Sequence, residues 1–169
     1  MNCKKIVKYF KNTNHIKEVY NLDENNLKHD KYYTFYPKRL GGTLKNSRIY
    51  NHGKLQGEYI EFYQGEIPYI KCFYNNGELE NTYLEYYPNG KIAFEKNYNN
   101  GKLNGKYAEY VPTGKKRILT NFKNGEVHGE YIIFDNFGIS IKEVKLFDNG
   151  VLINQPTEKN DKSKHYVIL

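Results

Sequence analysis

Histidines and cysteines are the residues of this chain best suited to hold a metal or to act as nucleophiles. The 169 residues include five histidines and two cysteines, which are His15, His29, His52, His128, His165, Cys3 and Cys72. Zinc sites usually show close ligand pairs, such as two cysteines separated by two to four residues. No pair here has that spacing, so the sequence predicts no metal site and no cofactor. His52 and His128 align with Asn76 and Asn104 of similar stretches, which indicates solvated turn residues.

Three glutamates recur at a fixed interval and are the carboxylates most suggestive of acid–base chemistry. Glu61, Glu85 and Glu109 follow one another at 24-residue spacing. Acid–base catalysis needs two carboxylates in different environments, whereas a repeated row places each carboxylate in a similar environment. The row therefore favours a structural face, and neither GxxxxGK[ST] nor GxGxxG occurs in the chain. The sequence predicts that this protein is not an enzyme.

These glutamates belong to a repeat of about 24 residues that organises most of the chain. Each unit starts at a glycine that follows an aromatic residue and a turn-forming pair, and these glycines are Gly53, Gly77, Gly101, Gly125 and Gly150. A tyrosine stands six residues after the first four glycines, at Tyr59, Tyr83, Tyr107 and Tyr131. Asn-Gly pairs favour tight hairpin turns, and the segments between turns are short and rich in aromatic and β-branched residues. Each unit is therefore predicted to be one β-hairpin.

Hairpins in series predict an all-β fold, namely an elongated antiparallel β-meander that forms a single twisted sheet of about ten strands with almost no helix. Leu, Ile, Val and Phe total 42 residues, which is too few for a thick two-layer core. The 18 tyrosines are expected to pack against one another instead, each ring covering its neighbours.

The segment Asn100-Gly-Lys-Leu-Asn-Gly-Lys-Tyr107, followed by an aromatic residue and Asn-Gly, resembles the MORN repeat. It is most similar to the 24-residue variant found in YwqK-like antitoxin proteins of bacteria and in proteins of large DNA viruses. The resemblance covers residues 53–153 well and residues 9–50 weakly. It implies tandem MORN-like β-hairpin repeats used for scaffolding, dimerisation or peripheral membrane contact.

Charge and regularity divide the chain into three segments. Residues 1–52 are degenerate repeats with 11 basic and 4 acidic residues, and residues 53–153 form the regular array, whose charges nearly cancel. Residues 154–169 form a polar tail that ends in an apolar cluster, His165-Tyr-Val-Ile-Leu169, which is either a peptide anchor or a cap on the array. The basic segment is a candidate docking surface for an acidic protein or an anionic membrane, although its lysines would also protect an exposed edge strand. Glutamates interleaved along the array argue against nucleic acid as a partner.

The sequence therefore predicts a non-enzymatic protein-interaction or scaffold module. A mean hydropathy of −0.85 and the lack of a signal or spanning segment predict a cytoplasmic location, or a location in a virion. Alternative functions are an antitoxin or immunity-like protein, a structural component of a viral particle, and a peripheral membrane binder. Self-association through the open ends of the sheet is also expected. The candidate partner-binding residues are Tyr59, Tyr63, Tyr83, Tyr87, Tyr107, Tyr131, Lys4, Lys5, Lys8 and Lys11.

Overall fold

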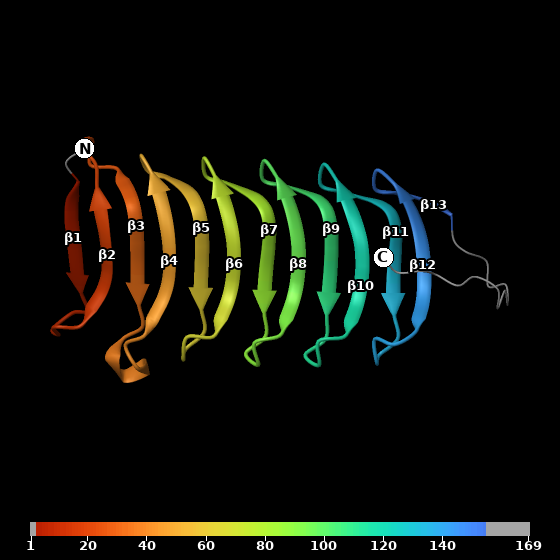
Figure 1. The fold of residues 1–169 in the computed structure, drawn as a ribbon, viewed down its shortest axis with the longest axis horizontal. Helices are drawn as coiled ribbons and strands as arrows, with labels where there is room; N and C mark the ends of the chain where they lie inside the picture. Colours follow the sequence, from red (N-terminus) through yellow and green to blue (C-terminus); the bar gives the residue numbers. More distant parts are fainter. Residues whose placement is uncertain (1–2, 155–169) are drawn as a thin grey trace.

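The computed structural model describes residues 3–154. These residues form one antiparallel sheet of thirteen strands, in which every strand pairs with its neighbours in the sequence (Figure 1). The predicted all-β meander is confirmed. The number of strands exceeds the expected ten because the weakly repetitive residues 4–51 still contribute four full strands.

The strands have nearly uniform length, as the fixed repeat requires. They are β1 (Lys4–Tyr9), β2 (Ile16–Leu22), β3 (Lys28–Phe35), β4 (Leu44–Asn51), β5 (Lys54–Phe62), β6 (Pro68–Asn75), β7 (Glu78–Tyr86), β8 (Ile92–Asn99), β9 (Lys102–Tyr110), β10 (Lys116–Lys123), β11 (Glu126–Phe134), β12 (Ile141–Asp148) and β13 (Val151–Asn154). One short 3₁₀ turn, η1 (Lys38–Leu40), is the only helical element in the described residues. The predicted polar tail, residues 154–169, lies outside the described residues except for Asn154 in β13.

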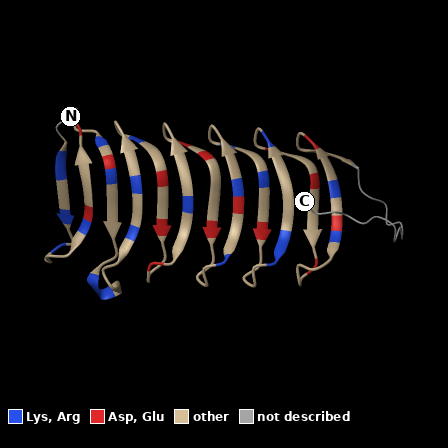
Figure 2. Cartoon of the chain, viewed as in Figure 1, with Lys and Arg blue, Asp and Glu red and all other residues tan. Residues whose placement is uncertain are grey.

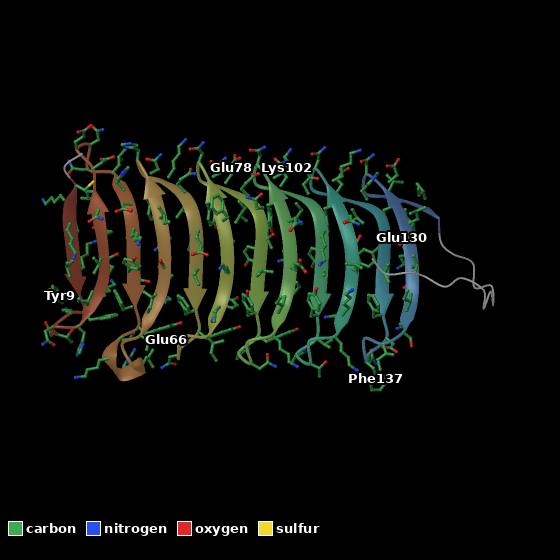
Figure 3. All side chains as sticks on the ribbon, viewed as in Figure 1. Tyr9, Glu66, Glu78, Lys102, Glu130 and Phe137 are labelled. Carbon is green, nitrogen blue, oxygen red and sulfur yellow. The ribbon has the colours of Figure 1, made fainter. Side chains whose placement is uncertain are left out.

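The Asn-Gly turns all lie at the same end of the strands and stack on one another. In the turn before β7, Asn76 and Gly77 have φ values of 51° and 92°, which Asn and Gly tolerate better than other residues. The Gly77 N–H donates to the Leu55 carbonyl of the preceding unit at 2.8 Å. Glu78 and Lys102, which begin β7 and β9, lie at this end of the strands, whereas Glu66 and Phe137 lie in turns at the opposite end (Figure 3).

The second glycine of each unit marks a β-bulge rather than a turn. Gly57 lies within β5 with φ of 91°, beside a break in the β4–β5 register. A Cβ atom at Gly57 would approach Ile49 Cδ1 to 3.3 Å, so both the backbone angle and the space favour glycine. In the second regular unit, Asn81 on β7 takes this role with φ of 60°.

The interior of the molecule is thin, and tyrosines supply much of its packing. Only five hydrophobic side chains are buried among the described residues, namely Tyr32, Cys72, Ala93, Ala108 and Phe134. Edge-to-face or tilted aromatic pairs recur across the β5–β6, β7–β8, β9–β10 and β11–β12 strand pairs, with centroids 5.4–6.1 Å apart: Tyr59–Tyr74, Tyr83–Tyr98, Tyr107–Phe122 and Tyr131–Phe147. Such pairs stabilise a sheet beyond the apolar area that they bury. Within residues 3–154, no helix has the length and apolar character needed to span a bilayer.

Candidate functional site

The repeated tyrosines predicted to bind a partner form a row across one face of the sheet, defined here as the tyrosine face. Tyr59, Tyr83, Tyr107 and Tyr131 are all half-buried. The Tyr59 hydroxyl donates to Glu61 at 3.0 Å, and the Tyr107 hydroxyl donates to Glu109 at 2.7 Å. Burial and the neighbouring carboxylate raise the pKa of both phenols. Glu61 and Glu109 thus accept hydrogen bonds within their own strands, in accord with a structural face.

Tyr63 and Tyr87, which were also predicted to bind a partner, form hydrogen bonds to the next unit of the chain. The Tyr63 hydroxyl donates to the Tyr86 carbonyl at 2.8 Å, and the Tyr87 hydroxyl donates to the Tyr110 carbonyl at 2.7 Å. Tyr36 makes the same bond to the Phe62 carbonyl at 2.9 Å. These side chains connect successive hairpins, so their hydroxyls are already engaged within the protein.

The four predicted lysines lie at the N-terminal end of the sheet and have different surroundings. Lys4, Lys5 and Lys8 lie on the terminal strand β1, and Lys11 lies in the turn that follows it. Lys8 Nζ forms an ion pair with Glu18 at 2.9 Å, and this carboxylate raises the pKa of Lys8. Figure 2 shows basic residues gathered on β1 and η1, whereas acidic residues lie near one end of β5, β7 and β9.

Near Glu18 the regular pattern of the tyrosine face is interrupted. In the regular array, neighbours across the strands alternate between a glutamate and a large apolar residue, as in Glu61, Ile70, Glu85, Phe94 and Glu109. The same row continues from Glu61 to Asn46 on β4 and then to Thr34 on β3. Two short polar residues therefore stand where the array carries longer side chains. Together they leave room for a hollow.

This hollow, defined here as the N-terminal hollow, has a volume of about 470 Å³. Its polar lining consists of Lys17, Glu18, Thr34, Asn46, Lys45 and Arg48, and its apolar lining consists of Phe10, Phe35, Tyr36, Pro37 and Leu40. Three of its polar atoms, Thr34 Oγ1, Asn46 Oδ1 and Arg48 Nε, are buried and have no hydrogen-bond partner among the described residues. Asn46 is only 7% exposed. An unsatisfied buried polar group costs about 1–3 kcal/mol, so a ligand that bonds to these atoms would recover stability.

A second hollow of about 430 Å³ adjoins the first and shares Phe10 and Pro37 with it. It lies between the β1–β2 turn and η1, and its other lining residues are Lys11, Thr13, His15, Lys38 and Arg39. The extra residues between Pro37 and Gly42, which interrupt the 24-residue spacing, form η1 and one wall of this hollow. The basic pair Lys38-Arg39 is the one signal in the sequence of this segment that points to a binding role.

Electrostatically, the two hollows favour an anionic ligand. Six cationic side chains line them, namely Lys11, Lys17, Lys38, Arg39, Lys45 and Arg48, against the single carboxylate of Glu18. Glu18 accepts hydrogen bonds from Tyr32 and Lys8, and these contacts outweigh burial and lower its pKa. The Arg48 guanidinium lies over the Tyr32 ring at 4.5 Å from the centroid, which holds its side chain in place.

The cysteines offer little chemistry at this site. Both are free, and Cys72 is buried whereas Cys3 is exposed. Burial raises the pKa of the Cys72 thiol to about 11, which keeps it protonated and unreactive near neutral pH.

One cluster of potential metal ligands was missed from the sequence. Asp23, His29 and His52 place one ligand atom each within 4.8 Å of the others. His52 does occupy a turn, with φ of 44°, but its Nδ1 lies 2.6 Å from Oδ2 of the buried Asp23 and is not simply solvated. The ligands are 6 and 23 residues apart in the sequence, so local ligand spacing could not reveal them.

The fold and these sites define an open, single-sheet array of β-hairpin repeats with a basic, hollowed N-terminal end. No family model matches the chain, and no curated protein matches its sequence.

Proposed function

We propose that this chain is a non-enzymatic protein-interaction module of the MORN-like hairpin-repeat type, and that its N-terminal hollow binds an acidic segment of a partner protein. The observation that carries the proposal is the set of buried, unpartnered atoms on Thr34, Asn46 and Arg48, surrounded by cationic side chains. Their donor and acceptor groups suit a peptide, which offers both carboxylates and backbone amides.

The departure of these positions from the repeat also supports a binding role. The array carries Glu61 at the position of Thr34 and Ile70 at the position of Asn46, whereas the position of Arg48 holds Cys72, Lys96, Thr120 and Lys145 in successive units. Exceptions to a locally consistent pattern concentrate at functional sites.

The test is fluorescence anisotropy with a labelled peptide of alternating Asp and Glu residues. The wild-type protein should bind this peptide, and the repeat-restoring variant Thr34→Glu/Asn46→Ile/Arg48→Thr should bind it about tenfold or more weakly, since a hydrogen bond to a charged group contributes about 1.5–3 kcal/mol. Lys96→Thr, a cation removed from the regular array, is the matched control and should leave affinity unchanged.

Two other ligands test whether the partner is a membrane or a nucleic acid instead of an acidic protein. Vesicles containing phosphatidylserine and a single-stranded DNA oligonucleotide are titrated against the same proteins. If either binds more tightly than the acidic peptide and loses affinity in the repeat-restoring variant, the proposed partner class is wrong. Equal peptide binding by the wild-type and repeat-restoring proteins would reject the site itself.

Self-association through the end of the sheet is a second candidate function, favoured by the composition of β13. In this terminal strand, Val151 is 64% exposed and Ile153 is 57% exposed. An exposed apolar strand at a sheet edge is a template for pairing with another chain. Assembly into a scaffold or a viral particle would use such an edge.

We further propose a cytoplasmic setting for the protein. Its two cysteines are both free, and Cys72 is buried away from any partner thiol, which suits a reducing compartment.

A further inference from the structure

We propose that Asp23, His29 and His52 form a binding site for a divalent transition metal of the zinc class, which would join two successive turns at the N-terminal end of the sheet. This site is separate from the N-terminal hollow, and the inference does not depend on the proposed function. It is the one group of three potential ligands that residues 3–154 bring together.

The stacking of turns places the three side chains side by side. Asp23 begins the β2–β3 turn, His29 lies early in β3, and His52 lies in the β4–β5 turn. The Gly53 N–H donates to the Lys28 carbonyl at 2.7 Å, which holds the second turn against the first residue of β3. As a result, the rings of His29 and His52 have centroids only 4.8 Å apart.

The Asp23 carboxylate is held in place by the turn that it begins. Its side chain is fully buried, and Oδ1 accepts hydrogen bonds from the N–H groups of Asn25 and Leu27, both at 2.9 Å. Oδ2 faces His52 and is the oxygen available to a metal.

The formation of the β4–β5 turn does not require histidine at either position. The residues equivalent to His29 in the regular array are Gln56, Glu80, Asn104 and His128. The side-chain oxygens of Gln56 and Glu80 accept the turn N–H groups of Asn76 and Asn100 at 2.9 and 2.8 Å. His29 makes the same contact to the His52 N–H at a longer 3.4 Å. His29 therefore bonds to the β4–β5 turn less well than Gln or Glu bonds to the regular turns. The β4–β5 turn itself carries His52 where the regular turns have Asn.

Imidazole nitrogen and carboxylate oxygen together match the ligand preference of Zn²⁺. Bonds of about 2.0–2.2 Å place tetrahedral ligands about 3.3 Å from one another. The Asp23–His52 contact of 2.6 Å must therefore open slightly, and His29 must move inward from within 4.8 Å. His52 is 45% exposed at its side chain, so a metal has access from solvent and a water molecule can complete the coordination.

The experiment is titration of the full chain with ZnCl₂ by isothermal calorimetry, with melting temperature as a second readout. The variants His29→Gln and His52→Asn introduce the residues that the regular turns carry, so the fold should tolerate them. His128→Asn is the matched control, because His128 Nδ1 lies 3.3 Å from Asp148 but has no second histidine beside it among residues 3–154.

The wild-type protein should bind a single equivalent of Zn²⁺ and melt at a higher temperature with zinc, an effect reversed by EDTA. Each of the two site variants should lower zinc affinity about tenfold or more, whereas His128→Asn should not change it. Absence of saturable zinc binding would overturn the inference, as would a His29→Gln/His52→Asn double variant that binds like the wild type.

Imidazole NMR signals of the wild-type protein give a test that needs no variant to fold. Zinc should shift the ring signals of His29 and His52 and leave those of His128 in place. Shifts confined to other histidines would also overturn the inference.

Discussion

The Tyr63 hydroxyl donates a hydrogen bond of 2.8 Å to the main-chain carbonyl of Tyr86, 23 residues further along the chain. The bond connects one hairpin to the next, and Tyr87 repeats it to Tyr110. In a repeat protein each unit contacts only its neighbours, so stability depends on such contacts between units.

Removal of this hydroxyl should weaken the array without changing its fold. We expect Tyr63→Phe to lower the free energy of unfolding by about 0.5–1.5 kcal/mol, the usual contribution of one hydrogen bond. Urea denaturation measures the change, with Tyr33→Phe as a control because no hydrogen bond of the Tyr33 hydroxyl is seen in the described residues. An equal loss in both variants would mean that the inter-unit bond is not the cause.

Alkaline pH should destabilise the sheet through its tyrosines. Burial and a hydrogen bond to Glu18 raise the pKa of Tyr32 from 10.0 to about 12, and burial and Glu95 do the same for Tyr110. Because the folded state holds these protons more tightly, their contribution is complete below pH 10 and is lost as the pH rises towards 12. Thermal melts from neutral pH to pH 12 should show this decline, and Tyr32→Phe should reduce its steepness. A flat profile over that range would contradict the prediction.

The two thiols should differ in reactivity. Cys3 is exposed, whereas burial keeps Cys72 protonated with a pKa of about 11. Ellman's reagent should therefore modify one thiol in the native protein and both in denaturant. The Cys3→Ser variant should not react until it unfolds, and rapid modification of the native variant would show that Cys72 is accessible.

Filling the N-terminal hollow should stabilise the protein while impairing peptide binding. Asn46 is buried with its Oδ1 unpartnered, and the array places Ile70 at the equivalent position. We expect Asn46→Ile to raise the free energy of unfolding by about 1–3 kcal/mol, since it removes an unsatisfied polar group. The reciprocal change, Ile70→Asn, should lower it. A destabilised Asn46→Ile protein would show that the hollow is needed for folding rather than for binding.

Assembly through β13 should depend on its exposed apolar side chains. Ile153→Lys places a charge on this edge strand, a change that opposes edge-to-edge pairing. Light scattering coupled to size-exclusion chromatography should show a smaller assembly for this variant than for the wild type. A wild-type protein that stays monomeric at high concentration would exclude self-association as its function.

Much of the architecture could be predicted because the signals that encode it are local. Asn-Gly pairs determine the turns through backbone angles that few other residues adopt, as at Asn76-Gly77, and alternation then assigns Tyr59 and Glu61 to one face. The four N-terminal strands were harder to count, because residues 1–52 contain only Gly41 and Gly42 and lack the regularly spaced glycines that mark the units. Their pairing partners in the sheet compensate for the weak local pattern.

The candidate sites, in contrast, arise from contacts between units. The repeat, the hairpin turns, the open meander and the location of the basic segment could be predicted from the chain alone, since each depends on residues a few positions apart. The hollow beside Thr34 and Asn46, and the contact of His52 with Asp23 at a separation of 29 residues, became visible in the folded protein. The physical reason is that stacking sets the partner of each side chain across the strands, and sequence spacing does not record which groups then lie within bonding distance.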